Sequence, residues 1–395
     1  VAPGNGGTAS GDNRIVNVSI DATDFDALLE FVRSEGIEYT VVGPEAPLAA
    51  GVVDRWQDEG LKCFGPTKAA AQLESSKAFS KAFMQRWDIP TARWAAFTEF
   101  EAAKSYLSEF PVLPVIKASG LAAGKGVILP ESMDEAVAAL EEMMLNARFG
   151  DAGNEVVIEE RMVGPEISLL AICNGQTVCP LPAARDHKRL LDGDLGPNTG
   201  GMGAIAPIID SESELYEALT ASLQEVVDGM RSEGTPYVGV LYGGFMITPE
   251  GPRVLEFNCR FGDPETQAVL PLLADGDLAS YIRWAVDGAP APSSGSAIKK
   301  AAATIVLASE GYPGTYPKGR VISGLDSAGQ KPNVHVYHAG TRRTEGSVCT
   351  SGGRVLAVTG IGSDLDDALS TAYAAADLIE FEGKQCRRDV GVHRS

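Results

Sequence analysis

The sequence predicts a multi-domain protein that combines α/β and α+β architecture, and three observations lead to this. The chain has 395 residues, which allows two to four domains at roughly 100–200 residues per domain. Strand-like and helix-like segments alternate over the first 65 residues, as in a parallel sheet with covering helices. The Gly-, Pro- and Ser-rich stretch 288–296 is typical of a linker, and a smaller α+β pattern follows it.

The first 65 residues are expected to have the order βαβαβ. Strands are predicted at 15–20, 37–42 and 61–64, with helices at 24–34 and 48–59. Residues 43–47 (GPEAP) follow the second strand directly, at the edge where open α/β sheets bind ligands. A helical stretch then opens at Pro66, runs to about Trp87 and is ended by Ile89-Pro90.

The middle of the chain changes to a pattern with more strands. Helices are expected at 99–109, 132–147 and 214–231. Strands are expected at 112–118, 127–129, 155–160, 166–173, 177–184, 237–247 and 253–261, with a long loop from 184 to 203. Beyond the linker, strands are expected at 301–308, 335–338 and 354–358, followed by a helix at 365–379.

Charge and apolar runs exclude two classes of partner. With 33 Lys and Arg against 53 Asp and Glu, the net charge is −20, and such a field repels nucleic acid and anionic membranes. The long uncharged run 167–184 is interrupted by Asn174-Gly175-Gln176-Thr177, so it predicts two strands and a turn rather than a membrane span. We expect neither a nucleic-acid nor a membrane partner.

The cysteines and the N-terminus bear on the compartment. The six Cys have no C-x-x-C spacing and the four His no zinc pattern. Free thiols suit a reducing compartment, and no signal peptide opens the chain, so a cytoplasmic location is expected. Val1 is not an initiator Met and the chain enters on a loop, so we expect that an upstream segment is missing.

A glycine-rich loop between two strands is a candidate phosphate flap. It reads KASGLAAGKGV from Lys117 to Val127, and its glycines let backbone N–H groups approach an anion. It is not a Walker A loop, because the spacing from Gly120 to Gly124-Lys125 is one residue short and a strand follows. The alternative is a plain hairpin with an exposed Lys125. Lys117 favours the flap, since a Lys on an apolar strand is seldom buried without an anionic partner.

A second candidate is the strand 254–261. Alternation places Glu256, Asn258 and Arg260 on one face and the apolar residues on the other. A carboxylate and an amide oxygen two residues apart suit Mg²⁺, and the Arg fork suits a phosphoryl group. The alternative is an amphipathic strand whose polar face lies in water. The Asp263-Pro264-Glu265 run that follows is expected to cap a helix.

A third candidate is the basic run 185–189 (RDHKR) with the Gly-rich segment 192–203. It gives a local positive potential, and Asp186 within it could hold an ammonium group. The alternative is a solvated loop, and His187 has no partner motif of a nucleophilic triad. Together, the lysines, the flap, the metal pair and the Arg suit the positioning of ATP phosphates and phosphoryl transfer.

With these residues in place, the sequence resembles the phosphoribosylamine–glycine ligase (glycinamide ribonucleotide synthetase) family, ATP-grasp enzymes of purine biosynthesis. The resemblance covers nearly the whole chain. It rests on the motifs PGNGGTA (3–9), VGPEAPL (42–48), FGPT (64–67), SSKAF around Lys77, KASGLAAGKGV (117–127), DHKR (186–189), GPNTGGMGA (196–204), LEFNCRFGDPETQ (255–267) and GGRVLAVT (352–359).

The resemblance implies a reaction and an architecture. ATP would activate glycine as glycyl phosphate, and 5-phosphoribosylamine would attack it to give glycinamide ribonucleotide, ADP and phosphate. The fold would be an ATP-grasp fold at 72–290, with a mobile lid at about 92–164. An N-terminal Rossmann-like (pre-ATP-grasp) domain at 1–71 and a C-terminal α+β domain at 298–395 would flank it.

The resemblance also implies roles for individual residues. Lys77 and Lys117 would contact ATP phosphates, Gly124, Lys125 and Gly126 would cover them, and the metal, Mg²⁺ or Mn²⁺, would bind Glu256 and Asn258. Glu159, Glu160, Met162 and Val163 would form the adenine hinge, and Glu166 would bind the ribose. Arg260, Asp186 and Lys125 would be catalytic. Glycine and product would be held by Asp186 with Asn198, Thr199, Gly200, Gly201, Met202 and Gly203, and phosphoribosylamine by Gly4, Asn5, Gly6, Gly7, Thr8, Pro44 and Glu45.

The sequence departs from the family pattern at two places, and alternative functions stay open. The family opens with a strand and a Gly-Gly-Arg-Glu-His-like run, so the first domain is expected to lack its opening βα unit, and Ser119 replaces a common acidic residue. A monomer or weak dimer is expected, and fusion to other purine-pathway enzymes is left open. The alternatives are another ATP-grasp carboxylate–amine ligase, such as a biotin carboxylase-like protein, or a nucleotide-binding but inactive part of a larger polypeptide.

Overall fold

A four-stranded antiparallel sheet forms the centre of the molecule. The computed structural model describes residues 1–9, 14–122, 126–146, 148–273, 277–292 and 299–392. The strands of the central sheet run in the order β14-β13-β7-β8 and comprise Gly251–Asn258 (β14), Val238–Thr248 (β13), Glu166–Asn174 (β7) and Val178–Pro180 (β8). The expected hairpin through residues 248–252 is confirmed, with Thr248 opposite Gly251.

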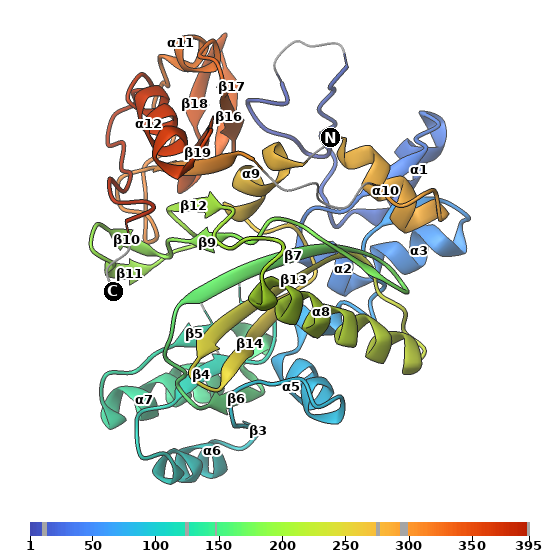
Figure 1. The fold of residues 1–395 in the computed structure, drawn as a ribbon, viewed down its shortest axis with the longest axis vertical. Coiled ribbons are helices and arrows are strands. Elements are labelled where there is room, and N and C mark those ends of the chain that lie inside the picture. Colours follow the sequence, from blue (N-terminus) through green and yellow to red (C-terminus); the bar gives the residue numbers. More distant parts are fainter. Residues whose placement is uncertain (10–13, 123–125, 147, 274–276, 293–298, 393–395) are drawn as a thin grey trace.

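Helices cover both faces of this sheet. Leu169 and Ala171 of β7 belong to the cluster that includes the inner face of α8 (Glu214–Ser232), whereas Leu170 and Ile172 belong to the cluster with α10 (Leu278–Asp287). Successive side chains of a strand point to opposite faces, and residues 167–173 of β7 are accordingly buried on both faces. Figure 1 shows α8 and α10 on opposite sides of β7 and β13. Helix α10 was not predicted from the sequence.

A second antiparallel sheet lies below the first in Figure 1. Its strands run in the order β3-β6-β4-β5 and comprise Trp94–Phe97 (β3), Val156–Glu159 (β6), Val115–Ala118 (β4) and Val127–Ile128 (β5). One face packs on α6 (Phe100–Tyr106) and α7 (Met133–Leu140). The expected helix 132–147 changes to a π-helix at Glu141–Leu145, and strand β3 was not predicted. Short 3₁₀ turns span Leu107–Glu109 (η1) and Gly150–Gly153 (η3).

The N-terminal region contains two parallel strands and five helices among its described residues. The strands are Tyr39–Val41 (β1) and Lys62–Phe64 (β2), and the helices are Phe25–Ser34 (α1), Glu45–Ala50 (α2), Val52–Asp58 (α3), Gln72–Ser75 (α4) and Lys77–Arg86 (α5). The expected strand at 15–20 is wrong: Val16 accepts from the Val1 amino group, and Val18 donates to the Val1 carbonyl. The expected helix 48–59 is divided at Gly51, whose φ is +94°.

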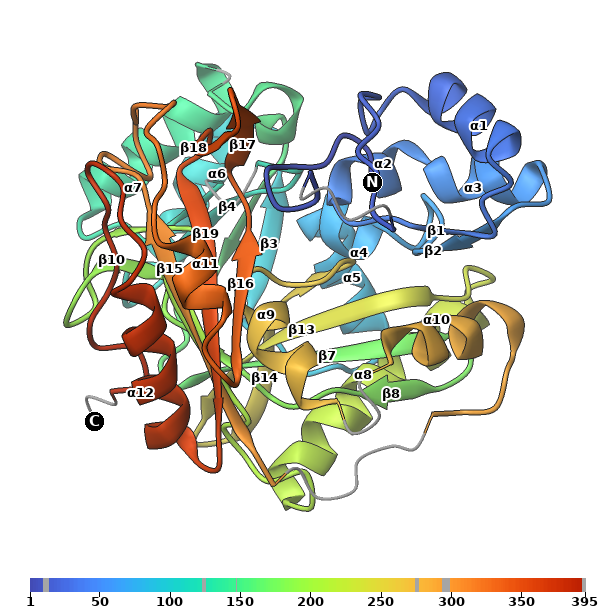
Figure 2. The ribbon, with the colours of Figure 1, turned by 90° about the horizontal axis from the view of Figure 1, so that it is seen from above.

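The C-terminal region has a five-stranded sheet that also takes strands from before the linker. Its strands run in the order β16-β19-β15-β12-β9 and comprise Val334–His338 (β16), Arg354–Gly362 (β19), Ala301–Ala308 (β15), Gly203–Ala206 (β12) and Arg185–Asp186 (β9). Helix α12 (Leu365–Ala376) packs on it through buried alanines. Figure 2 shows α12 beside this sheet. The domain boundaries at 71 and 290 stay a prediction.

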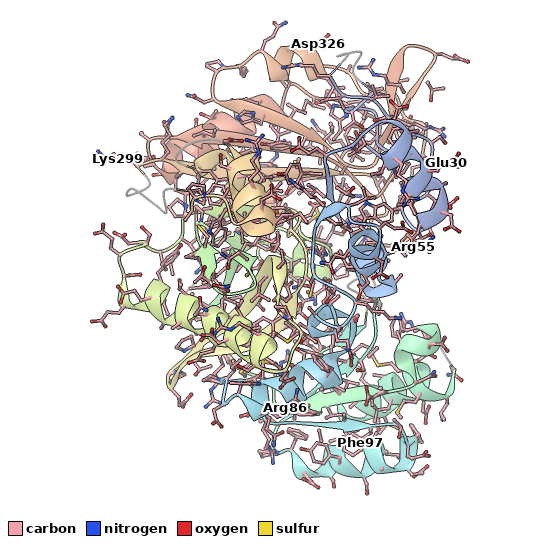
Figure 3. The ribbon with its side chains drawn as sticks, turned by 90° about the vertical axis from the view of Figure 1, so that its right-hand side faces the viewer. Glu30, Arg55, Arg86, Phe97, Lys299 and Asp326 are labelled. Atoms are coloured by element: carbon pink, nitrogen blue, oxygen red, sulfur yellow. The ribbon has the colours of Figure 1, made fainter. Side chains whose placement is uncertain are left out.

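The segment expected as one long loop therefore contains strands. Besides β9, it forms the antiparallel hairpin of β10 (Arg189–Leu191) and β11 (Leu195–Asn198), and it ends at Gly203, the first residue of β12. The remaining elements are β17 (Thr341–Thr344), β18 (Ser347–Thr350), α9 (Glu265–Val269), η4 (Leu270–Leu272) and α11 (Leu325–Gly329). Asp326 of α11 and Phe97 of β3 lie at opposite ends of the molecule in Figure 3. Within the described residues, no helix is long and apolar enough to span a membrane.

Candidate active site

A cavity of about 190 Å³ lies between the central sheet and the second sheet. It is bordered by residues from β14, β4, β5, α2, α4 and α5, although these segments are far apart in the sequence. Of the residues singled out from the sequence, those lining it are Glu45, Lys77, Lys117, Gly126, Glu256, Asn258 and Arg260. The polar face expected on strand 254–261 therefore borders a cavity rather than open water.

A direct bond joins the two sheets at this cavity. The Lys117 ammonium on β4 donates to the Leu255 carbonyl on β14, 3.2 Å away. That carbonyl lies at a bulge, since Gly244 pairs with Glu256 and Phe245 with Val254, which leaves Leu255 as the extra residue. A bulge takes one residue out of the ladder, so its carbonyl can accept from a side chain. The register of β13 and β14 thus leaves the Leu255 carbonyl available to accept from Lys117.

A buried charge cluster includes two of the lysines that line the cavity, Lys81 and Lys117. The Glu159 carboxylate, 2% exposed, pairs with Lys117 Nζ at 2.5 Å and with Lys81 Nζ at 2.6 Å. Lys81 also donates to the Thr91 hydroxyl at 2.6 Å. The sequence interpretation missed Lys81, yet it lies four residues after Lys77 on α5 and therefore on the same helix face. That spacing was the signal that could have found it.

The electrostatics of the cavity favour a charged carboxylate among ammonium groups. Burial raises the pKa of Glu256, but Lys117 and Lys77 outweigh it and hold that pKa below its ordinary value. Burial lowers the pKa of Lys117, but Glu159 and Glu256 outweigh it and raise that pKa. Burial lowers the pKa of Lys77, and it lowers the pKa of Lys81 to about 8. The cavity therefore combines lysine ammonium groups with the ionised carboxylate of Glu256.

Arg260 is held at the edge of the cavity by two carboxylates. Its Nε lies 3.2 Å from Glu45 Oε2, and its Nη2 lies 3.5 Å from Glu74 Oε1. Glu45 is the first residue of α2, directly after Pro44. Glu74, which the sequence interpretation missed, also accepts from the Cys259 amide at 2.6 Å, and burial raises its pKa to about 7. The guanidinium is thus positioned before any ligand binds.

The two ends of the glycine-rich loop border the same cavity. Ala122 and Gly126 line it, whereas the predicted flap residues Gly124 and Lys125 lie outside the described residues. A Cβ on Gly126 would lie 2.7 Å from Ala122 Cβ, so this position has no room for a side chain. Ser119 fixes the start of the loop, because its carbonyl accepts from Lys77 N at 2.8 Å and its hydroxyl from Ala78 N at 3.1 Å.

The residues expected to bind adenine and ribose lie outside the lining of this cavity. Glu160 follows β6, and its amide donates to the Arg93 carbonyl at 2.8 Å. Met162 is half-buried, and Val163 is 79% exposed. Glu166 opens β7 and pairs with Lys188. The side chain of Glu159, at the start of this stretch, points instead to Lys81 and Lys117.

A second polar group surrounds Asp186 on β9. Its Oδ1 atom is buried and has no hydrogen-bond partner. Burial, and next the neighbouring Glu265, raise the pKa of Asp186 well above its ordinary value, although Lys188 opposes them. A Cβ on Gly201 would lie 2.6 Å from this oxygen, and Gly201 has a φ of +110°. Only glycine fits the backbone that passes over Asp186.

The loop around Gly201 is held by its neighbours. Thr199 donates to the Lys188 carbonyl through its amide and its hydroxyl, at 2.7 and 2.8 Å. Gly200 donates to the Tyr312 hydroxyl and accepts from Arg354, at 2.8 and 2.5 Å. On either side of these residues, Asn198 ends β11 and Gly203 opens β12, and Met202 is fully buried. Asp263 was expected to cap α9, but Pro264 holds the cap position, and Asp263 pairs with Arg354 at 3.2 Å.

The N-terminal glycine segment packs on the C-terminal region and does not line the cavity. The side-chain Nδ2 of Asn5 donates to the His338 carbonyl at 2.6 Å, and Gly6 N donates to the Thr341 carbonyl at 3.0 Å. Gly7 N and Thr8 N donate to Asn5 Oδ1, and Gly4 has a φ of +83°. This segment therefore forms a compact turn against β16 and β17.

Three family models match successive parts of the chain. The N domain of phosphoribosylglycinamide synthetase matches residues 1–74, its ATP-grasp (A) domain residues 75–266, and its C domain residues 302–393. The human trifunctional purine biosynthetic protein adenosine-3 is 52% identical over 99% of this chain, which spans only 39% of the length of that protein. The phosphoribosylamine–glycine ligase of Chlorobaculum tepidum is 48% identical, with 99% of this chain and 92% of the relative aligned.

Solved structures of the same architecture are also similar to the chain. The crystal structure of phosphoribosylamine–glycine ligase from Thermotoga maritima matches with a TM-score of 0.84 and 32% identity, covering 98% of this chain and 92% of the other. The biotin carboxylase domain of the Hydrogenobacter thermophilus 2-oxoglutarate carboxylase matches with a TM-score of 0.71 and 17% identity, over 93% and 80%. The second likeness concerns the fold alone. The expected fold class, including its ATP-grasp part, is confirmed.

Proposed function

Because the chain belongs to the phosphoribosylglycinamide synthetase family, we propose that it ligates glycine to 5-phosphoribosylamine at the expense of ATP. The products are glycinamide ribonucleotide, ADP and phosphate. The single observation that carries the proposal is the bond from Lys117 of the second sheet to Leu255 of the central sheet, beside a cavity lined by Glu256 and Asn258. A polyphosphate held there meets ammonium groups from one side and oxygen ligands from the other.

The residues at the cavity suit ATP and a divalent metal. Glu256 and Asn258 offer two hard oxygen ligands, which fits Mg²⁺ or Mn²⁺ with phosphate oxygens as further ligands. No group of three or more His, Cys, Asp or Glu side chains in the described part of the chain could hold a metal by itself. Glu256 and Asn258 would hold the ion, which would supply positive charge to offset that of the phosphates. Lys77 and Lys117 would neutralise further phosphate charge.

The chemistry has two steps. In the first, one oxygen of the glycine carboxylate attacks the γ-phosphorus, and the bond from that phosphorus to ADP breaks. In the second, the amine of phosphoribosylamine attacks the acyl carbon, the bond to phosphate breaks, and the nitrogen gives up one proton. Arg260, oriented by Glu45 and Glu74, would stabilise the negative charge on the transferred phosphoryl group.

Water would hydrolyse the acyl phosphate, so the site has to close during the reaction. The glycine-rich loop suits this role, since both Ala122 and Gly126 border the cavity next to Glu256. We propose that Gly124 and Lys125 cover the phosphates from there and that Lys125 contributes to catalysis. In the same proposal, Glu159, Glu160, Met162 and Val163 flank adenine, and Glu166 binds the ribose.

Asp186 is proposed to bind the ammonium group of glycine. Its Oδ1 atom is buried without a partner, and an ammonium donor would remove the cost of leaving that oxygen unpaired. The segment Asn198–Gly203 closes over it, with Gly201 in direct proximity. Gly4–Thr8 with Pro44 and Glu45 are proposed to contribute to the phosphoribosylamine pocket. Glu45 supports this assignment, since it borders the cavity and contacts Arg260.

The test is an ADP-release assay with each substrate omitted in turn. The chain should release ADP only when glycine, phosphoribosylamine, ATP and Mg²⁺ are all present. Glu256→Gln should lower kcat by at least about a hundredfold, whereas Glu250→Gln is the matched control, because Glu250 is exposed in the turn of the same hairpin. ADP release that does not depend on glycine, or an unchanged kcat in Glu256→Gln, would contradict the proposal. Such a result would favour an inactive nucleotide-binding chain or another ligase.

The proposal also covers the oligomeric state of the chain, its fusion to other enzymes and its cellular compartment. The chain covers 92% of the length of the Chlorobaculum tepidum ligase and 39% of the length of the human protein. Both a free-standing and a fused form are therefore compatible with it. The six free cysteines, five of them buried, support a reducing cytoplasmic compartment. A monomer or weak dimer is proposed, and sedimentation analysis would test it.

A further inference from the structure

The C-terminal segment 387–391 is clamped onto the hairpin of β10 and β11. Arg387, only 1% exposed, pairs through Nη1 with Asp194 at 2.7 Å, and through Nε and Nη2 with Asp389 at 2.7 and 2.9 Å. Its Nη1 also donates to the Arg189 carbonyl at 3.3 Å. The Arg387 guanidinium thus connects the C-terminal segment to strand β10 and to the turn of the hairpin, 193 to 198 residues earlier in the sequence.

Backbone contacts extend this clamp toward Asp186. Gly193 N donates to Asp389 Oδ2 at 2.6 Å, and Arg388 N donates to Asp192 Oδ1 at 2.8 Å. Gly391 N donates to His187 Nε2 at 3.1 Å. His187 is therefore neutral, with Nδ1 as the donor to the Gly203 carbonyl at 3.3 Å. The clamp reaches the residue directly beside Asp186.

From His187 the connection continues into the loop over Asp186. His187 N donates to the Gly203 carbonyl at 2.9 Å, and Met202 N donates to the His187 carbonyl at 2.8 Å. The position of the Gly201 backbone against Asp186 thus depends on how His187 is held. The hairpin cannot supply this alone, because an isolated two-stranded hairpin is marginally stable and its Leu191 and Leu195 side chains are 50% and 64% exposed.

We propose that Arg387 is a positioning residue, which fixes the segment 187–203 and thereby sets the affinity for the substrate that Asp186 binds. The inference rests on the proposed function, in which that substrate is glycine. Arg387 acts through the hairpin and His187 and does not line the ATP cavity. Its loss should therefore weaken glycine binding and leave ATP binding intact.

The test compares two variants of the clamp with a matched control. Arg387→Met removes the charge and keeps an aliphatic stem. Asp194→Asn is the milder variant, because Asp194 is 68% exposed and Asn tolerates its φ of +55°. Arg388→Ala is the control, since Arg388 is the next residue but its side chain pairs with Asp377 on the surface, at 2.7 Å with both side chains about half exposed.

We expect the glycine KM to rise about tenfold or more in Arg387→Met and about threefold in Asp194→Asn, with the ATP KM within about twofold of the unaltered chain. Hydrogen exchange of peptides from 187–203 should be faster in both variants, and unchanged in Arg388→Ala. A merely structural role would raise both KM values together or lower kcat alone. If Arg387→Met does not fold, Asp194→Asn decides the question.

The proposal is overturned if the glycine KM and the exchange of 187–203 stay unchanged in Asp194→Asn, or if the ATP KM rises equally. An unaltered chain with no glycine-dependent ADP release would instead overturn the proposed function. The two failures are thus distinguishable, because the first requires an active, glycine-dependent enzyme.

Discussion

Replacing Glu159 by Gln would leave two ammonium groups buried without their shared carboxylate. Glu159 lies 2.5 Å from Lys117 and 2.6 Å from Lys81, and the three side chains are 2–5% exposed. Removing one partner of a buried ion pair costs about 3–5 kcal/mol, because the remaining charge is uncompensated. We expect the free energy of unfolding to fall by about this amount in Glu159→Gln.

Two comparisons isolate this effect in urea unfolding followed by circular dichroism. Asp228→Asn breaks the ion pair of Asp228 with Arg231, in which the Arg231 side chain is 49% and the Asp228 side chain 44% exposed. This change should lower the free energy of unfolding by about 1 kcal/mol or less. Adding Lys81→Met to Glu159→Gln removes one of the unpaired ammonium groups and should recover about 1 kcal/mol or more. If Glu159→Gln costs no more than Asp228→Asn, the buried cluster does not contribute as argued.

Three further predictions concern the ligands and pH. Chelation of divalent metal should abolish ADP release, and added Mg²⁺ should restore it in the unaltered chain but poorly in Glu256→Gln; restoration in both would remove Glu256 from the metal site. Asp186→Asn should raise the glycine KM about tenfold to a hundredfold and leave the ATP KM unchanged; a parallel rise would place Asp186 elsewhere in the mechanism. Burial lowers the pKa of His187 to about 4, so as pH falls below about 6.5 the unfolded chain takes up a proton that the folded chain does not, and stability is lost toward pH 4. Urea midpoints from pH 7 to 4 should fall less in His187→Gln than in the unaltered chain, and equal slopes would refute this.

Local patterns in the sequence predicted most helices and the strand that borders the cavity. Helix α8 begins where Ser213 accepts from Tyr216 N, and α1 where Asp24 accepts from Ala27 N. Caps and apolar periodicity are local properties, so they can be predicted without knowing the partner elements. The alternation of Glu256 and Asn258 along β14 was predicted for the same reason.

Pairing between distant segments could not be predicted in this way. The strand expected at 15–20 did not form, because its valines contact Val1 instead of a sheet. Conversely, β9 pairs with β12 in the C-terminal sheet, although β9 lies in the segment 184–203 that was expected to be a loop. Periodicity reports which face of a segment is apolar, but the tertiary fold decides which partner covers it.

The sequence by itself determined the class of the protein, the order of its main elements and the residue types of the proposed phosphate and metal site. Only the tertiary structure decided that Lys81 shares Glu159 with Lys117, and that Arg387 holds the hairpin beside Asp186. The strength of an ion pair depends on distance and burial, and both arise only when segments far apart in the chain pack together.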